Sequence, residues 1–296
     1  TIIKIRQQRY VELTRFDNPH TVVLQNGKNY DFKFQTRMIE GKKIYESRFE
    51  ANENDVFVVM SDGAIYAGIG GEYAFGWGRE NIIRYLEEHY SREMTAKQIA
   101  RMLAAECYRL YQGRPGDDTT IAVLRLCKRK AANVMIGPPS SKALDRVIVR
   151  DFFSQEGIKI VCGGTTSSIA ARYLGKTVRT ELNFVDPDIP PIAHIDGVDL
   201  VTEGVITINR VLEYAKDYLK DNEAYKDWSY KQDGASMICR LLFEEATDIN
   251  FFVGRAMNPA HQNPELPINF NIKMQLVSEL SECLKKMGKR IKVSYF

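Results

Sequence analysis

Acidic residues stand at the ends of two apolar runs in the first half of the chain. Asp62 follows the run 56–60 after a single serine, and Asp117 and Asp118 come just before the run 119–124. Short runs rich in β-branched and aromatic residues are typical of β-strands. Carboxylates at strand ends can meet at one edge of a sheet, and clustered oxygen ligands suit Mg²⁺ or Mn²⁺ rather than zinc. The pattern therefore predicts a metal-dependent reaction on a phosphate group.

Each acidic motif taken alone also fits an ordinary turn. Asp62-Gly63 is one of the commonest turn dipeptides, and an aspartate before Thr119-Thr120 is a good local cap. The metal site is favoured over two unrelated turns because both motifs occur together, in an order and with surroundings that match a family pattern.

The two motifs resemble those of the metal-dependent protein phosphatases (PPM family), most closely the bacterial stage II sporulation E-type branch. The matching stretches read Asn-Asp-Val-Phe-Val-Val-Met-Ser-Asp-Gly at 54–63 and Gly-Asp-Asp-Thr-Thr-Ile-Ala-Val-Leu-Arg at 116–125. The resemblance covers about residues 1–127, less than half of the chain. It implies that Asp62 and Asp117 bind metal, that Gly63 allows the tight turn that aims Asp62, and that Asp118 supports the site.

The resemblance also implies a reaction and a role in bacterial signalling. Two Mn²⁺ or Mg²⁺ ions would activate a water molecule that attacks the phosphorus of a phosphoserine or phosphothreonine in a protein substrate. Arg79 and Arg114 lie near the motifs and could bind the phosphate, although both also fit ordinary surface positions.

One part of the family pattern has no counterpart in this sequence. The family carries an earlier motif, an Asp and an Asp-Gly pair, whose side chains bridge the two metal ions. The aspartates before Asp62 are Asp17, Asp31 and Asp55, and none is followed by glycine. Since the chain begins at Thr1, we expect a fragment that lacks the first metal motif. The alternative is a degenerate, non-catalytic family member.

Composition and length fit a globular protein of two domains. The chain has 296 residues, 44% of them hydrophobic and 27% charged, and a net charge of +3. This charge is too small to indicate nucleic-acid binding, and no apolar run approaches the roughly 20 residues of a membrane span. Five cysteines without CxxC spacing argue against a disulfide framework or a zinc site and favour a reducing, cytoplasmic location.

The first domain, residues 1–128, is expected to combine strands with covering helices as an α+β fold, a truncated PPM-type β-sandwich. Asn26-Gly27 between apolar segments predicts a β-hairpin. The expected strands are 2–16, 21–49, 56–60 and 119–126, and the expected helices are 79–89 and 95–110.

The second domain, residues 131–296, alternates strand and helix signals, which predicts an open, mostly parallel α/β sheet. The expected strands are 133–136, 158–161, 198–201, 251–253 and 291–295. The expected helices are 144–155, 168–174, 208–219, 234–245 and 272–287.

A ligand site is expected beyond the carboxyl ends of these parallel strands. Gly163, Gly164, Thr165 and Thr166 follow a strand and lead into a helix, whose free amide groups favour a small anion. The same residues also fit a simple helix cap. No GxGxxG fingerprint of dinucleotide binding is present.

Three further polar residues follow the strands of the second domain. Glu203 could bind a ribose, a metal or nothing, and His194 with Asp196 could form an acid–base pair at the same mouth. These residues support two alternatives to a phosphatase. One is a non-catalytic regulatory module that senses an anionic small molecule, and the other is a different phosphotransfer or nucleotide-binding enzyme.

Overall fold

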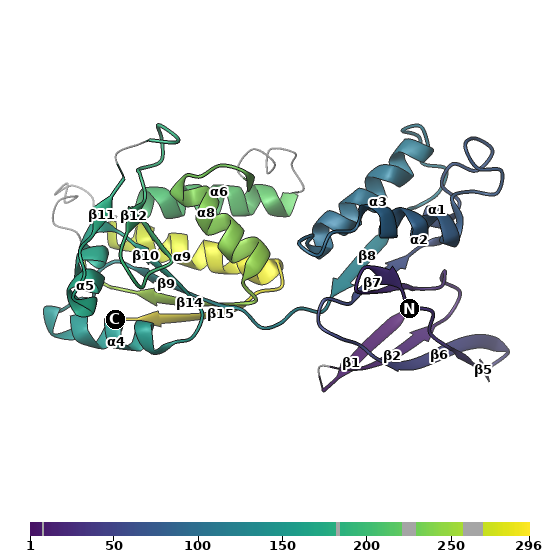
Figure 1. Cartoon of the computed structure of the whole chain (residues 1–296), viewed down its shortest axis with the longest axis horizontal. Coiled ribbons are helices and arrows are strands. Elements are labelled where there is room, and N and C mark those ends of the chain that lie inside the picture. Colours follow the sequence, from purple (N-terminus) through teal and green to yellow (C-terminus); the bar gives the residue numbers. More distant parts are fainter. Residues whose placement is uncertain (8, 182–183, 221–228, 257–268) are drawn as a thin grey trace. The chain divides into compact units, whose positions relative to one another are not determined.

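The computed structural model describes residues 1–296 apart from 8, 182–183, 221–228 and 257–268. The chain divides into two compact units, Thr1–Lys128 and Arg129–Phe296 (Figure 1).

Two antiparallel four-stranded sheets form the first unit, with the strand orders β1-β2-β6-β5 and β4-β3-β7-β8. Their strands are β1 (Ile2–Arg6), β2 (Tyr10–Arg15), β3 (Val22–Gln25), β4 (Lys28–Asn29), β5 (Gln35–Ile39), β6 (Lys42–Glu50), β7 (Val56–Met60) and β8 (Ile121–Arg125). The expected long strands 2–16 and 21–49 are therefore each broken by turns.

Tight hairpin turns make two of these breaks. Asn26 and Gly27 have φ values of 49° and 77°, and Glu40 and Gly41 have φ values of 46° and 76°. Two successive residues at positive φ are what a type I′ turn requires, and this turn matches the twist of the strands on either side. The hairpin predicted at Asn26-Gly27 is confirmed, with Gln25 paired to Lys28.

Strand β7 lies at the centre of the first unit, because its two faces pack against different layers. Val56, Val58 and Met60 face a core formed with the helices, whereas Phe57 faces the core between the two sheets. The helices are α1 (Asp62–Ile65), α2 (Gly78–His89) and α3 (Ala96–Leu110). They cover one face of the β4-β3-β7-β8 sheet, as Figure 1 shows.

Helix α3 begins where its sequence predicts. The Thr95 hydroxyl accepts a hydrogen bond from the Gln98 amide, and the Gln98 side chain accepts one from the Thr95 amide. This reciprocal capping box satisfies two amide groups that the first turn leaves free. Ile99, Leu103 and Cys107 then place one apolar face of the helix in the core.

A seven-stranded sheet in the order β11-β12-β13-β10-β9-β14-β15 forms the centre of the second unit. Its strands are β9 (Ala131–Ile136), β10 (Ile158–Cys162), β11 (Arg179–Thr180), β12 (Ala193–His194), β13 (Leu200–Thr202), β14 (Asp248–Val253) and β15 (Arg290–Tyr295). Strands β13, β10, β9, β14 and β15 are parallel, and β11 and β12 add an antiparallel edge. The predicted mostly parallel sheet is confirmed.

Helices cover both faces of this sheet. On one face, α4 (Asp145–Ser154) and α5 (Gly164–Leu174) pack against Met135, Val161 and Phe252. On the other face lie α6 (Val205–Lys220), α8 (Gly234–Cys239) with its π-helical continuation η2 (Arg240–Glu245), and α9 (Asn269–Lys286) (Figure 1). The short 3₁₀ turn η1 (Lys142–Leu144) precedes α4. A sheet wound in both directions from β9 places its switch point between β9 and β14.

Some sequence expectations for the second unit need correction. Helix α5 begins at Gly164 rather than at 168, so Thr165 and Thr166 belong to its first turn and not to a preceding loop. The edge strands β11 and β12 were not predicted, since each has only two residues.

All five cysteines are free, and four of them are buried. Within the described ranges, no helix has the length and apolar character that crossing a membrane requires.

Replacing Leu103 by alanine should destabilise the first unit by about 2–5 kcal/mol, because a large side chain that is 1% exposed would leave a cavity in a close-packed core. The urea midpoint reported by Trp77 fluorescence, in a Trp228→Phe background, measures this change. Ala105→Ser on the exposed face of the same helix should cost less than about 0.5 kcal/mol. Equal midpoints for the two variants would contradict this assignment of the core.

Candidate functional site

Ser61 joins the two strand ends that carry the acidic motifs. Strand β7 pairs with β8 up to Met60 and Ile121, and beyond them the Ser61 amide donates to the Thr120 carbonyl at 3.0 Å. The Ser61 hydroxyl accepts a hydrogen bond from the Thr120 amide at 2.9 Å and donates one to the Asp118 carbonyl at 3.0 Å. The segments that bear Asp62 and Asp118 are thereby held side by side.

Asp62 lies at the first position of α1 instead of in a simple strand-exit turn. Its carboxylate is exposed, and Oδ1 accepts a hydrogen bond from the Gly63 amide at 3.1 Å. An acidic side chain in the first turn of a helix is favoured by the free amide groups there. The carboxylate therefore has a defined position and keeps oxygen lone pairs free for a ligand.

Gly63 is required for a different reason from the expected one. Its φ is not in the left-handed region, but a Cβ added there would lie 2.6 Å from the Asp118 carbonyl oxygen and 2.8 Å from Thr119 Oγ1. The residue is buried, and its carbonyl accepts a hydrogen bond from the Tyr111 hydroxyl at 2.7 Å. Glycine thus permits the close approach of the two acidic segments rather than a tight turn.

Asp117 and Asp118 are exposed on the segment opposite Asp62. Asp117 Oδ1 accepts a hydrogen bond from the Asp118 amide at 2.8 Å, and the Thr119 hydroxyl donates to the Asp117 carbonyl at 3.2 Å. Burial, and after it the charges of Cys107, Asp117 and Asp62, raise the pKa of Tyr111. The Ser61 contacts with Thr120 and Asp118 bring the segment of Asp117 beside that of Asp62.

These residues have some, but not all, of the features of a binding site for a hard divalent cation. Asp62, Asp117 and Asp118 offer carboxylate oxygens, and within the described part of the chain no arginine, lysine or histidine forms an ion pair with them. However, no group of three or more His, Cys, Asp or Glu side chains arranged to hold a metal occurs among the described residues. These three carboxylates would supply some of the oxygen ligands of such an ion and not a complete shell.

Basic residues lie at the same end of the first unit, and two of them were missed by sequence reasoning. Arg15 is the last residue of β2, and His20 comes two residues before Val22, which pairs with Val58 of β7. Arg79 is in the first turn of α2. Residues on separate elements have no fixed spacing along the chain. The sequence therefore indicated Arg79, which lies near an acidic motif, and gave no indication of Arg15 or His20. Arg114, the other expected phosphate ligand, lies exposed in the loop after α3.

In the second unit, the predicted anion site lies at the carboxyl end of β10. Gly163 has φ 107° and precedes α5, whose first turn has no side-chain cap. Thr166 is 2% exposed, and its Oγ1 is buried without a hydrogen-bond partner. This oxygen lies 3.3 Å from the position that a Cβ on Gly163 would take. The structure thus brings Gly163, Gly164, Thr165 and Thr166 together around one helix N-terminus.

The neighbouring helix N-termini at this edge are already filled by the chain's own carboxylates. Glu203 Oε2 accepts hydrogen bonds from the amides of Ile206 at 3.0 Å and Thr207 at 3.3 Å. Asp233 caps α8 in the same way, through the Ser236 amide at 2.9 Å. Glu203 is therefore a helix cap, a role that was not expected from the sequence.

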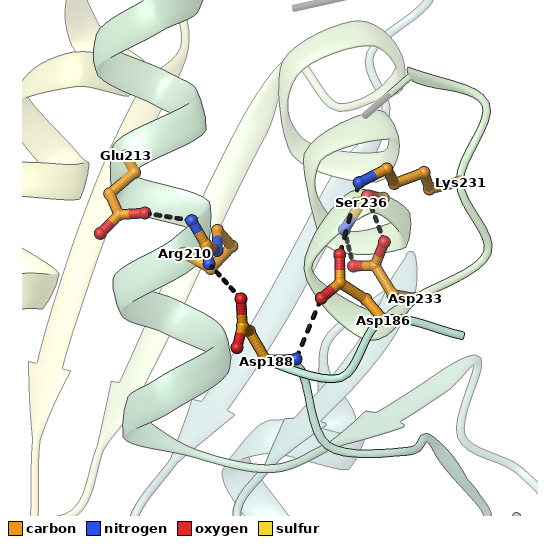
Figure 2. A network of polar contacts seen from close by, with 7 residues as sticks. All are labelled: Asp186, Asp188, Arg210, Glu213, Lys231, Asp233 and Ser236. Carbon is orange, nitrogen blue, oxygen red and sulfur yellow. Dashed lines mark hydrogen bonds and ion pairs between the residues drawn. The ribbon is translucent and has the colours of Figure 1, made fainter. Parts of the chain in front are cut away.

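A charged network holds the segment 186–192 over the carboxyl end of β13. Asp186 pairs with Lys231 at 3.3 Å and accepts a hydrogen bond from the Asp188 amide at 3.0 Å, as Figure 2 shows. Asp188 pairs in turn with Arg210 of α6 at 3.7 Å, and Arg210 also binds Glu213 at 2.8 Å. The pKa of Asp186 is lowered, chiefly by the hydrogen bond from the Asp188 amide.

The expected pair of His194 and Asp196 does not form. His194 Nε2 lies 2.7 Å from Glu181 Oε1, and Asp196 binds Arg179 at 2.8 Å. These residues line a cavity of about 620 Å³ on the loop that enters β13, at the opposite end of that strand from Glu203. Because β12 runs antiparallel to β13, which was not predicted, His194 and Asp196 lie away from the end of the sheet where they were expected.

Comparison with known proteins connects the first unit to one family. Residues 4–126 match the family of stage II sporulation protein E (SpoIIE). No curated protein sequence matches this chain.

Similar solved structures include the phosphatase domain of the cell fate determinant SpoIIE from Bacillus subtilis. A form presoaked with Mn is 18% identical, with a TM-score of 0.37, and the match covers 44% of this chain and 56% of that one. A second structure of the domain is 19% identical, with a TM-score of 0.36 and coverage of 43% and 57%. The present chain thus spans little more than half the length of these domains.

Replacing Gly63 by alanine should disrupt the acidic edge, because the new Cβ would lie 2.6 Å from a backbone oxygen that cannot move without displacing Asp118. We expect a loss of stability of about 1–3 kcal/mol and a weaker Mn²⁺ affinity. Urea denaturation and isothermal titration with Mn²⁺ measure the two effects. Gly71→Ala is the matched control, since its Cβ would meet the nearest atom at an ordinary 3.5 Å. Wild-type Mn²⁺ binding by the Gly63 variant would show that the close approach is not needed.

Proposed function

We propose that the first unit is the metal-ligand half of a serine/threonine protein phosphatase, because residues 4–126 match the family of stage II sporulation protein E. The proposed substrate is a phosphoserine or phosphothreonine residue in a protein, and the proposed cofactor is Mn²⁺ or Mg²⁺. We propose further that the chain carries part of the domain, with the bridging acidic motif of the family outside these residues.

The observation that carries this proposal is the joining of the two acidic segments through Ser61. Its hydroxyl contacts both Thr120 and Asp118, so the ends of β7 and β8 present Asp62 and Asp117 at one edge. Two exposed carboxylates held together in this way repel one another unless a cation neutralises them. Such an arrangement costs stability and is favoured at sites that bind a ligand.

Each residue of the edge would have a distinct part in the reaction. Asp62 and Asp117 would hold the cation, Gly63 would permit their approach, and Asp118 would support the segment through its backbone contact with Ser61. A bound Mn²⁺ or Mg²⁺ lowers the pKa of a coordinated water and neutralises charge on phosphoryl oxygens. No side chain of this edge is needed as a covalent nucleophile, consistent with the buried positions of four of the five cysteines.

Asp62→Asn and Asp117→Asn, each in the full-length gene product, should lower Mn²⁺-dependent hydrolysis of p-nitrophenyl phosphate and of a phosphoserine peptide by at least about 100-fold. An amide is a neutral and weaker ligand for a hard cation, so the loss follows from lost metal affinity. Initial rates measured with Mn²⁺ and with chelator test this. Circular dichroism should show that the fold is retained, because both side chains are exposed.

Asp17→Asn is the matched control, since Asp17 lies on an exposed turn at φ 55°, a conformation that asparagine tolerates. It should leave turnover unchanged. Full turnover in either the Asp62 or the Asp117 variant would refute the site. Loss of turnover in the control alone would refute it as well.

We propose a second, separate function for the second unit: binding of a small anion at the N-terminus of α5. Supporting this, the first turn of α5 has no side-chain cap, and Thr166 Oγ1 is buried without a partner beside Gly163. A phosphate or carboxylate group there could accept hydrogen bonds from the free amides and from the threonine hydroxyl. The nearby Glu203 carboxylate is held on α6 by its own amide bonds, which limits its repulsion of the anion.

The test of this second function is ligand-induced stabilisation. ADP or inorganic phosphate at about 100 times its Kd should stabilise the second unit by roughly 2.7 kcal/mol, and the double variant Thr165→Ala/Thr166→Ala should lose this effect. Differential scanning fluorimetry measures it. Ser168→Ala, an exposed position one residue beyond the first turn, should keep the stabilisation. Stabilisation that persists in the double variant would place the ligand elsewhere.

A further inference from the structure

The first unit holds three polar nitrogens that are buried without a hydrogen-bond partner near one another. They are Nε and Nη2 of Arg79 and Nδ1 of His20. The remaining Arg79 nitrogen, Nη1, makes one long contact of 3.4 Å to Glu80, whose side chain is 83% exposed. Although the Arg79 side chain as a whole is 21% exposed, its two buried donors lack an acceptor among the described residues, and a buried donor left without one costs free energy.

Arg15 adds a second positive charge to this cluster. Its Nη1 donates to the Asn18 carbonyl at 2.9 Å, and its guanidinium lies over the ring of Tyr45 at 4.3 Å. Within the described ranges, no carboxylate forms an ion pair with Arg15. Burial and the neighbouring Arg79 both lower the pKa of Arg15, the former more strongly. The two arginines thus lie within electrostatic reach of each other, and among the described residues the one acid that pairs with either of them is the exposed Glu80.

His20 is fixed between the arginines and an aromatic wall. Its ring lies 4.7 Å from the ring of Phe32 and 5.7 Å from that of Phe34. Burial, followed by the charges of Arg79 and Arg15, lowers the pKa of His20 to about 4, while Asp31 acts weakly in the opposite direction. At neutral pH the imidazole is therefore uncharged, and it can donate one hydrogen bond without adding to the repulsion between the arginines.

We propose that Arg15, His20 and Arg79 form a binding pocket for a phosphate oxyanion. Two guanidinium groups and one imidazole N–H supply positive charge and directed donors, the combination that binds phosphate most strongly in proteins. Such an anion would satisfy the buried nitrogens of Arg79 and His20 at the same time.

The position of the pocket suggests what carries the phosphate. His20 precedes β3, and Val22 of that strand pairs with Val58 of β7, so His20 lies towards the end of the sheet from which Asp62 projects. If the first unit acts as the proposed phosphatase, the pocket is placed to hold a phosphoryl group beside the metal edge. The identity of the molecule that bears the bound phosphate group rests on the proposed function, whereas the pocket itself does not.

Phosphate binding to the full chain, measured with chelator present, separates the two proposals. Isothermal titration with inorganic phosphate, against NaCl at equal ionic strength, should show binding that Arg79→Gln weakens by about 10-fold to 100-fold. Arg84→Gln, an exposed arginine on the same helix, should bind as the wild type does. Because no metal is present, the result does not depend on whether Asp62 and Asp117 hold a cation.

Two further readouts distinguish a binding pocket from a structural role. Phosphate should raise the pKa of His20, followed by ring NMR signals assigned with His20→Gln, because a bound anion favours the charged imidazole. Without phosphate, Arg79→Gln should melt no lower than the wild type, since the charge that it removes has only the long contact with the exposed Glu80. Competition by a phosphoserine peptide, but not by its unphosphorylated form, assigns the pocket to the substrate, and binding of inorganic phosphate alone assigns it to the released product.

Either assignment supports the pocket. Three results would overturn it: no phosphate binding by the wild type, equal binding by Arg79→Gln, or a melting temperature of Arg79→Gln well below that of the wild type together with an unshifted His20 signal. The last combination would mean that Arg79 serves packing and not ligand binding.

Discussion

The hydroxyl of Ser61 is the contact on which the acidic edge of the first unit depends. It accepts from the Thr120 amide and donates to the Asp118 carbonyl, and so continues the pairing of β7 and β8 one residue past the last ladder bonds. Two carboxylate-bearing segments would otherwise move apart, because their charges repel. The absence of a side chain at Gly63 completes the arrangement, since any Cβ there would enter the space of the Asp118 carbonyl.

Local sequence signals predicted the elements that position this edge. The run 56–60 reads as a strand because its residues alternate between two cores, and the Thr95–Gln98 pair fixes the start of α3 by local hydrogen bonds alone. The contact between Ser61 and Asp118 has no such signal, because 57 residues separate its partners. The sequence therefore indicated the two acidic segments and not the contact that holds them side by side.

In the second unit, the same limit of local sequence signals explains why the sheet was predicted correctly and why the pair of His194 and Asp196 was not. Repeated strand and helix signals predicted the parallel sheet, because its central strands β9 and β10 are buried on both faces and read as mostly apolar runs. The expected pair of His194 and Asp196 does not form because the two side chains bind Glu181 and Arg179, which lie on or beside β11, an edge strand of only two residues. The antiparallel direction of β12 places both residues at the other end of β13 from the expected site, and composition does not reveal that direction.

Opposite charges gather at one end of the first unit without neutralising each other. Asp62 and Asp117 project from the ends of β7 and β8, while Arg15 and Arg79 approach from β2 and α2, and no ion pair links the two groups among the described residues. A fold shaped by stability alone would gain by pairing these charges. Their separation is explained if each group has its own ligand: a cation for the carboxylates and an anion for the arginines. Under the proposed function, a metal-bound phosphate monoester would carry both charges in one ligand, and the two clusters would bind the two ends of the same substrate complex.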